Sequence, residues 1–323
     1  MVIAFAAIAL TLIAGRAAAQ ALEAKKEIAP FADEVSKRHG IPRAEIVALL
    51  SQAKVSQRIL DLMARPAEGK PWREYRAIFI TEERIAGGVA FYKANAETLA
   101  RAERVYGVSP EVIVAIIGVE TYYGERAGTI RVLDALCTLA FRFPRRSAFF
   151  RKELESYVLL AREEGLPALE IKGSYAGAMG IPQFIPSSYR HFAVDFNDDR
   201  IRDLISSTDD AIGSVASYLA EHGWVNGGPV ATPVTVTGDA YASIVRKGLK
   251  PATTKKRMRA RGVTFTDDPA SDDERAALLE YEGASGTEYW VGYANFYAIT
   301  RYNHSQLYAL AVHQLARSIR ARL

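Results

Sequence analysis

One segment of this chain is too apolar to lie at a surface. Residues 109–124 open with Ser109-Pro110-Glu111, a strong helix start with serine at the N-cap and proline at the first helical position. The run from Val112 to Val119 then presents no polar face. Because a helix that is hydrophobic all round must be buried, the fold has to pack other elements around this one.

Glu120 is the one acid near the end of this helix. It follows Ile113, Ile116 and Ile117 by seven, four and three residues, so its carboxyl group shares their apolar face. Burial there favours the neutral acid and raises its pKa, which is the condition for a general acid near neutral pH. The alternative, on spacing alone, is a glutamate turned outward or paired with an arginine.

Helical periodicity covers most of the remaining chain. Apolar residues recur at three- and four-residue spacing from about residue 23 to 104 and from 109 to about 223. Between 230 and 263 the pattern changes, and Val234 to Val236 alternates as a short strand, which predicts a small β-containing lobe. A last helix is predicted over 305–320, with one apolar stripe.

The first 21 residues predict a secretory signal. Val2 to Ala14 is almost wholly apolar but too short to span a bilayer comfortably, and Ala17 to Ala19 fits the small-residue pattern of a cleavage site. The usual positive charge at the start is missing, and a buried N-terminal helix is the alternative. Since no cysteine lies near the cleavage point, we expect a periplasmic protein without a lipoprotein anchor.

Composition excludes several classes of site and partner. The single cysteine, Cys137, rules out an intrachain disulfide and a multi-cysteine metal site, and its apolar neighbours predict burial. A net charge of +4 suits an anionic polymer without selecting one. The basic run 246–261 lacks the interleaved aromatic residues of a single-strand platform, so no nucleic-acid partner is predicted.

A second group of candidate site residues follows the helix of Glu120. The segment from Ser174 to Tyr189 combines small residues with a serine, a glutamine and tyrosines. Small residues let backbone approach a ligand, and the polar and aromatic side chains suit a sugar. Alone, such a stretch indicates only a tight turn, and it lacks the lysine and the spacing of a phosphate loop.

At this point the sequence resembles the lytic murein transglycosylases of the membrane-bound transglycosylase B type, which have a lysozyme-like core. Together with matching spacing, the motifs extend the resemblance from about Tyr75 to Leu315. The matching motifs are Gly118–Thr121, Phe143–Arg146, Ser174–Ser188, Asp210–Tyr218 and Gly292–Ser305.

The resemblance implies a role for each matching residue. Glu120 resembles the family's sole catalytic acid/base, and Arg145 and Arg146 match a site for the stem peptide or the muramyl carboxylate. Tyr75 matches an outer-subsite aromatic. The positions that match glycan contacts or the cleft lining are Ser174, Gln183, Tyr218, Tyr297, Tyr302 and Asn303.

The loop 195–203 has the donor spacing of an EF-hand calcium loop. Its oxygen donors are Asp195, Asn197, Asp199 and Asp203, with the carbonyl of Ile201 between, and the resemblance implies closure of the site by Asp210. Arg200 replaces the turn glycine, however, and Ser206 stands where a bidentate glutamate is usual. A structural calcium ion and a solvated acidic loop paired to Arg200 and Arg202 both remain open.

The expected fold is mainly α, with a lysozyme-like catalytic core, an additional α-helical region and a small β-containing lobe. The predicted division is a signal peptide (1–21), an N-terminal helical region (22–105), the catalytic core (106–229), the β-containing lobe (230–275) and a C-terminal segment completing the core (276–323).

The expected activity is cleavage of the MurNAc-GlcNAc β-1,4 bond of peptidoglycan, with a 1,6-anhydro-MurNAc product. Neither polar motif offers a second carboxylate, as ordinary glycoside hydrolysis needs. The resemblance implies that the substrate's own groups assist Glu120 instead. No cofactor is required for this chemistry, and peptidoglycan strands are the expected partner. The alternatives are a hydrolytic muramidase and a non-catalytic peptidoglycan-binding protein. Which cell-wall synthesis proteins it meets is not encoded in these motifs.

Overall fold

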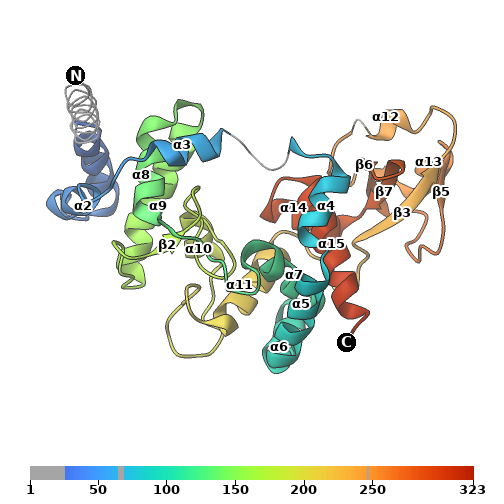
Figure 1. The fold of residues 1–323 in the computed structure, drawn as a ribbon, viewed down its shortest axis with the longest axis horizontal. Coiled ribbons are helices and arrows are strands. Elements are labelled where there is room, and N and C mark those ends of the chain that lie inside the picture. The colour runs from blue at the N-terminus through green and yellow to red at the C-terminus, as the bar shows by residue number, and fades with distance from the viewer. Residues whose placement is uncertain (1–25, 65–68, 246) are drawn as a thin grey trace, which may run out of the picture. The chain divides into compact units, whose positions relative to one another are not determined.

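The computed structural model describes residues 26–64, 69–245 and 247–323 (Figure 1). The chain divides into two compact units, each built from two separate segments. Unit 1 comprises the chain up to Arg65 and Ala127–His191, and unit 2 comprises Pro66–Arg126 and Phe192–Leu323. The predicted signal lies outside the described residues, and the predicted five-part division stays a prediction. Within the described ranges, no helix is both long and apolar enough to span a membrane.

Unit 1 is helical and carries one small sheet. Its core is α8 packed along α9, and the buried thiol of Cys137 lies on α8, as predicted. Strands β1 and β2 pair antiparallel, Ile130 opposite Gly173. The helices are residues 26–39, α2 (Arg43–Leu50), α3 (Gln57–Met63), α8 (Val132–Arg142), the 3-10 helix η2 (Pro144–Arg146), α9 (Ser147–Glu163) and α10 (Pro186–Phe192), and the strands are β1 (Ile130–Arg131) and β2 (Lys172–Gly173).

The glycine-rich stretch of unit 1 forms a tightly folded loop after β2. Bridges join Met179 to Gly173 and to Phe184. A Cβ atom at Gly173 would lie 2.0 Å from the carbonyl oxygen of Ala178, a distance that no side chain can adopt. Glycine is therefore required at position 173 for this fold of the loop.

Unit 2 packs helices around α7, the helix predicted to be buried. Helices α5, α6, α11 and α15 contact α7, and Val112 to Gly118 are buried along it. Ser109 occupies the N-cap but makes no side-chain capping bond, and the helix ends at Thr121 instead of continuing to Gly124. These helices are α4 (Trp72–Phe79), α5 (Glu82–Ala94), α6 (Ala96–Tyr106), α7 (Pro110–Thr121), α11 (Thr208–Glu221), α14 (Ala294–Tyr302) and α15 (Gln306–Arg320).

A five-stranded sheet in the order β4-β6-β7-β3-β5 forms the β-containing part of unit 2 (Figure 1). It extends to Gly292, past the predicted end of the lobe at 275. Its strands are β3 (Ala231–Val236), β4 (Thr253–Thr254), β5 (Val263–Phe265), β6 (Arg275–Gly283) and β7 (Gly286–Gly292), and its short helices are α12 (Ala242–Val245) and α13 (Lys255–Arg259).

One lysine of the basic run is a core residue of this lobe. Lys255 is 2% exposed, and its Nζ donates hydrogen bonds to the carbonyl oxygens of Asp268 (3.0 Å) and Ala270 (2.6 Å). Its Nζ also lies 3.6 Å from the carboxylate of Asp268, which accepts a hydrogen bond from Tyr293. The lysine therefore joins the segment 268–270 to α13.

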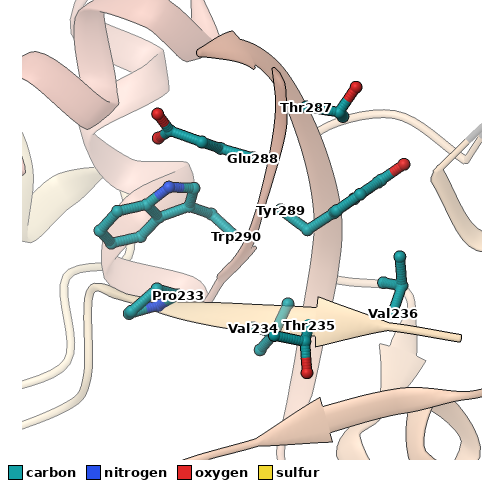
Figure 2. Close-up of a pocket in the computed structure, with 8 residues that line it drawn as sticks. All are labelled: Pro233, Val234, Thr235, Val236, Thr287, Glu288, Tyr289 and Trp290. Atoms are coloured by element: carbon teal, nitrogen blue, oxygen red, sulfur yellow. The ribbon is translucent and has the colours of Figure 1, made fainter. Parts of the chain in front are cut away.

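The sheet splits at its centre. Strands β3 and β7 pair from Ala231 opposite Gly292 to Val234 opposite Tyr289, and beyond that pair β3 continues only along β5. Figure 2 shows the side chains of both strands around the resulting pocket, of about 380 Å³. This pocket contains none of the residues predicted for the catalytic site.

Candidate active site

The carboxyl group of Glu120 lies at the end of α7 inside unit 2. The hydroxyl group of Tyr308, in the first turn of α15, donates a 2.6 Å hydrogen bond to its Oε1 atom. The residue keeps a partly exposed surface, yet protein groups surround the carboxyl densely. Burial raises the pKa of Glu120 to about 7, and the bond from Tyr308 opposes that rise.

No other carboxylate contributes to this shift. Among the described residues, only burial and Tyr308 move the pKa of Glu120. The buried glutamate of unit 1, Glu153, is occupied at the start of α10, where it accepts bonds from the backbone N–H (2.9 Å) and hydroxyl (2.8 Å) of Ser187. Glu120 is thus a proton donor and acceptor poised near neutral pH without a carboxylate partner.

Tyrosines predicted from the last motif and from α11 gather beside Glu120. The rings of Tyr302 and Tyr308 are parallel within 8°, with centroids 6.4 Å apart. The ring of Tyr218 meets that of Tyr302 edge-on at 4.9 Å. Burial, followed by the charge of Glu120, holds the pKa of Tyr302 and of Tyr308 well above the usual range, so both hydroxyls stay protonated.

Two of the predicted aromatic contacts are largely covered by protein. The Tyr218 ring stacks on His222 at 4.0 Å, and its hydroxyl donates to the carbonyl oxygen of Arg301 (2.6 Å). Tyr75 is 3% exposed and packs against Trp72 and Phe79. Their roles as glycan contacts stay predictions, because both rings are covered by neighbouring side chains.

Asn303 lines a pocket of about 640 Å³ in unit 2. Trp72 and Tyr281 form its aromatic part, and Tyr281 donates to the carbonyl oxygen of Gln306 (3.2 Å). The remaining predicted residue of this motif, Tyr297, is half-buried on α14, where the guanidinium of Arg301 lies 5.9 Å from its ring.

The other predicted contacts belong to unit 1. The hydroxyl oxygen of Ser174 accepts hydrogen bonds from Ala176 N–H (3.3 Å) and Ala178 N–H (3.1 Å), which stabilise the glycine-rich loop. The side-chain amide of Gln183 donates to the carbonyl oxygens of Ala127 (3.0 Å) and Gly180 (2.9 Å). Both half-buried side chains therefore shape the loop, and their roles as glycan contacts stay predictions.

Arg145 and Arg146 are exposed in the single turn of η2. The guanidinium of Arg146 lies 4.4 Å from the ring centre of Phe149, a cation–π contact that orders it. Stacking on a ring leaves the edge of a guanidinium, with its N–H donors, open to an anion.

The acidic loop folds around its own side chains in unit 2. Asp195 accepts backbone bonds from Asp199 (3.2 Å) and Arg200 (2.7 Å), and Arg200 adopts the left-handed conformation (φ 72°) where the EF-hand pattern wants glycine. Asp210 is fully buried, and its carboxylate accepts hydrogen bonds from the backbone N–H groups of Phe196 (2.7 Å) and Asp203 (2.8 Å). Burial raises the pKa of Asp210, and the charges of Asp195 and Asp199 add to the rise.

Three of the oxygen donors predicted for calcium accept hydrogen bonds within the loop. They belong to Asp195, Asn197 and Asp199, and the donors are backbone N–H groups. Within the described residues, however, no three acidic, histidine or cysteine side chains form a metal-binding group. The amide of Asn197 also bonds Asp199 (2.9 Å). The alternative of an acidic loop paired to Arg200 and Arg202 stays a prediction.

Sequence reasoning missed Tyr308, the direct partner of Glu120. It lies between apolar stripe positions of the last helix, and its N–H is capped by Ser305 at 3.4 Å. The stripe itself is confirmed for Leu310, Leu315 and Ile319, which are buried. Nothing in local spacing marks one tyrosine among many, because its partner is 188 residues away in the chain.

Comparisons with known proteins agree with this arrangement. Residues 23–317 match the family described as transglycosylase SLT domain. The chain is 43% identical over 299 residues to membrane-bound lytic murein transglycosylase B of Escherichia coli K12, covering 90% of this chain and 81% of that protein. It superposes on the soluble lytic transglycosylase SltB1 of Pseudomonas aeruginosa with a TM-score of 0.86 at 48% identity, over 92% of this chain and 99% of that one.

Two further solved structures contain bound groups. The Escherichia coli lytic transglycosylase Slt35 in complex with calcium has a TM-score of 0.81 at 42% identity, covering 93% of each chain. SltB3 of Pseudomonas aeruginosa, in complex with NAG-anhNAM-pentapeptide, has a TM-score of 0.82 at 30% identity, over 92% of this chain and 79% of that one.

Proposed function

This chain belongs to the transglycosylase SLT domain family, and on that premise we propose that it cleaves peptidoglycan strands at the MurNAc-GlcNAc β-1,4 bond. The observation that carries the proposal is the solitary Glu120 carboxyl group, with a pKa of about 7 and one bond from Tyr308. A group with that pKa is protonated in a large fraction of molecules at neutral pH and returns readily to the carboxylate. The predicted fold, mainly α with a small sheet and lysozyme-like, is confirmed by the same relatives.

Glu120 serves twice in the proposed reaction. As an acid it gives its proton to the glycosidic oxygen, the C1–O bond breaks, and the GlcNAc side leaves as an alcohol. The 2-acetamido group of MurNAc steadies the cationic centre at C1. The Glu120 carboxylate then takes the proton of the 6-hydroxyl of the same sugar while its oxygen closes onto C1. The products are a 1,6-anhydro-MurNAc end and a restored acid, with no water consumed.

The surroundings of Glu120 favour this route over hydrolysis with two carboxylates, because its pKa is shifted by burial and by Tyr308. Hydrolysis with inversion or retention needs a second acid about 5 to 9.5 Å from the first, and in the described residues no carboxylate perturbs Glu120. A muramidase that admits water to the same carboxyl remains the alternative product route. Mass spectrometry of fragments released from purified sacculi separates the two, because an anhydro end is lighter by one water. Reducing ends alone would overturn the transglycosylase proposal.

The remaining predicted residues are proposed to bind the substrate. Arg145 and Arg146 offer exposed guanidinium groups to carboxylates of the stem peptide or the lactyl ether, and their exposure supports that role. SltB3 was solved with NAG-anhNAM-pentapeptide, a ligand with such carboxylates. The proposed glycan contacts are Ser174, Gln183, Tyr75, Tyr218, Tyr297, Tyr302 and Asn303.

A structural calcium ion at the acidic loop is a separate proposal. The ligands would be Asp195, Asn197, Asp199, the Ile201 carbonyl and Asp210. The supporting observation is the mutual repulsion of Asp195, Asp199 and Asp210, which a bound cation would relieve. The ion would stabilise the loop, and no proton transfer at Glu120 depends on it. The proposed location is the periplasm, where peptidoglycan lies.

A further inference from the structure

We propose that Arg84 is a positioning residue that fixes the end of α7, so that Glu120 keeps one geometry through both proton transfers. The inference rests on the proposed function of Glu120. It concerns a buried guanidinium group of α5 that bonds the last turn of α7. Among the contacts of the described residues, none joins it to the carboxyl group of Glu120 or to a predicted substrate contact.

Arg84 bonds the last turn of the catalytic helix. It is 8% exposed, and its Nη1 atom donates to the carbonyl oxygen of Gly118, two residues before Glu120. The same oxygen accepts the N–H of Tyr122 at 3.2 Å. Because the carbonyls at a helix C-terminus carry partial negative charge, a cation at this place stabilises the turn.

Arg84 also holds the residue that ends the helix. Its guanidinium carbon lies 4.7 Å from the ring centre of Tyr122, and that of Arg126 lies 4.5 Å from the same ring. Tyr122 has a φ of 55°, in the left-handed region where a bulky residue is strained. Such conformations persist where neighbouring structure over-determines them, often at functional sites.

The next residue is locked against the same helix, α5. Tyr123, with a φ of 64°, donates through its hydroxyl to the carbonyl oxygen of Arg84 at 2.6 Å. Its ring fills a slot in which a Cβ atom at Gly87 or Gly118 would lie within 3 Å of it. The backbone leaving Glu120 is therefore fixed to α5 on two successive residues.

Stability alone gives a poor account of this buried arginine. Over the part of the chain that the structure describes, no carboxylate pairs with Arg84, and its Nε has no hydrogen-bond partner. Burying a cation without an ion pair and with one N–H unsatisfied opposes folding. A role in the reaction explains its placement, since a small displacement of a catalytic group costs a large factor in rate.

The test compares three variants with one control. Arg84→Met removes charge and donor but keeps an apolar stem, and Arg84→Lys keeps one donor without a planar group. Tyr122→Gly removes the stacked ring at a position where glycine accepts the backbone conformation without strain. Lys255→Met is the matched control, since it removes another buried cation that bonds carbonyl oxygens, at the start of α13 in unit 2.

We expect Arg84→Met and Tyr122→Gly to lower kcat about 10- to 100-fold with little change in KM, and Arg84→Lys to recover part of the loss. A loosened turn lets water reach Glu120, which faces the hydroxyls of Tyr308 and Tyr302, so the alkaline limb of the pH–kcat profile should move to lower pH. Loss of a nearby positive charge alone would move it the other way, to higher pH.

Lys255→Met should lower the melting temperature and leave the limb in place. The proposal fails if Arg84→Met keeps both the wild-type kcat and the wild-type alkaline limb of the pH–kcat profile. It also fails if Arg84→Met loses kcat only in proportion to its fall in melting temperature, while the alkaline limb stays in place. Retained cleavage by Glu120→Gln would overturn the proposed function and this inference together. An inactive Glu120→Gln beside a fully active Arg84→Met would overturn this inference alone.

Discussion

The hydroxyl group of Tyr308 donates a 2.6 Å hydrogen bond to the carboxyl group of Glu120. The bond joins the C-terminal end of α7 to the N-terminal end of α15, two helices that are far apart in the sequence and pack together in the fold. It stabilises the carboxylate, whereas burial stabilises the acid, and the pKa of about 7 is the balance of the two.

Replacing Glu120 by glutamine should abolish cleavage and leave the fold intact. The amide is isosteric but cannot donate and then retrieve a proton, so we expect a loss of at least about 10²- to 10⁴-fold, measured as turnover of purified sacculi. Glu153→Gln is the control, because this other buried glutamate bonds only Ser187 in the described contacts. Equal losses in both variants would contradict the assignment.

The same variant should be more stable than the wild type at alkaline pH. The folded pKa of Glu120, about 7, lies above the unfolded value of about 4.5. The folded state therefore holds the proton more tightly, and stability falls as pH rises from the unfolded to the folded pKa. Glutamine removes that loss, by at most about 3 kcal/mol. Melting curves at pH 5 and pH 8 check it, and an equal gain at both would contradict it.

Removing the Tyr308 hydroxyl should raise the pKa of Glu120 further. Its hydrogen bond lowers that pKa, so Tyr308→Phe should move the alkaline limb of the pH–kcat profile to higher pH while lowering the maximal rate. Tyr157→Phe serves as control, since its hydroxyl bonds the carbonyl oxygen of Ala168 in unit 1 (2.7 Å). A limb that stays in place in Tyr308→Phe would show that the bond does not set the titration.

Changing Arg145 and Arg146 to alanine should weaken the binding of peptide-bearing glycan far more than the binding of bare chitooligosaccharide. Charged hydrogen bonds to a carboxylate contribute about 1.5 to 3 kcal/mol each, so the loss on the peptide ligand should reach at least tenfold in Kd. Calorimetric titration measures both ligands. Arg162→Ala, an exposed arginine paired with Glu45, should leave both affinities unchanged. Equal weakening on the two ligands would count against carboxylate binding.

Calcium should raise the melting temperature if the acidic loop binds it. An ion that binds only the folded state adds about 2.7 kcal/mol at a hundredfold excess over Kd. The comparison is calcium against chelator, in the wild type and in Asp199→Ala, which removes one loop ligand. Asp209→Asn, beside the site but bonded to Thr98, is the control. Coincident midpoints in the wild type would leave the loop as a self-paired acidic turn.

Local patterns predicted the elements well where one force dominates. The apolar run before Glu120 specifies a buried helix wherever it folds, and the short strand at Val234 to Val236 lies within β3. The N-cap and the end of α7 differ in detail from the prediction. Tyr122 ends the helix in a left-handed conformation that is held by tertiary contacts. Helix propensity alone predicts that the helix ends at Gly124.

Contacts between distant segments could not be predicted in the same way. Tyr308 and Arg84 meet α7 from opposite ends of the sequence, and each is one tyrosine or arginine among many. The motif pattern named Tyr75 and Tyr218, whereas the structure shows both rings largely covered. Spacing gives the face of a helix, and it does not say which neighbour covers that face.

The segments of the two units alternate along the sequence, and this order determines which unit can fold first during synthesis. Unit 1 is complete once His191 has been synthesised, whereas unit 2 waits for the last helix of the chain. At about 5 to 20 residues per second, α15 follows some seconds to tens of seconds later. Until then α7 lacks the helix that covers it and supplies Tyr308. A chain whose synthesis has not reached α15 therefore lacks the hydroxyl group that bonds Glu120, and the candidate site is complete only once α15 has packed on α7.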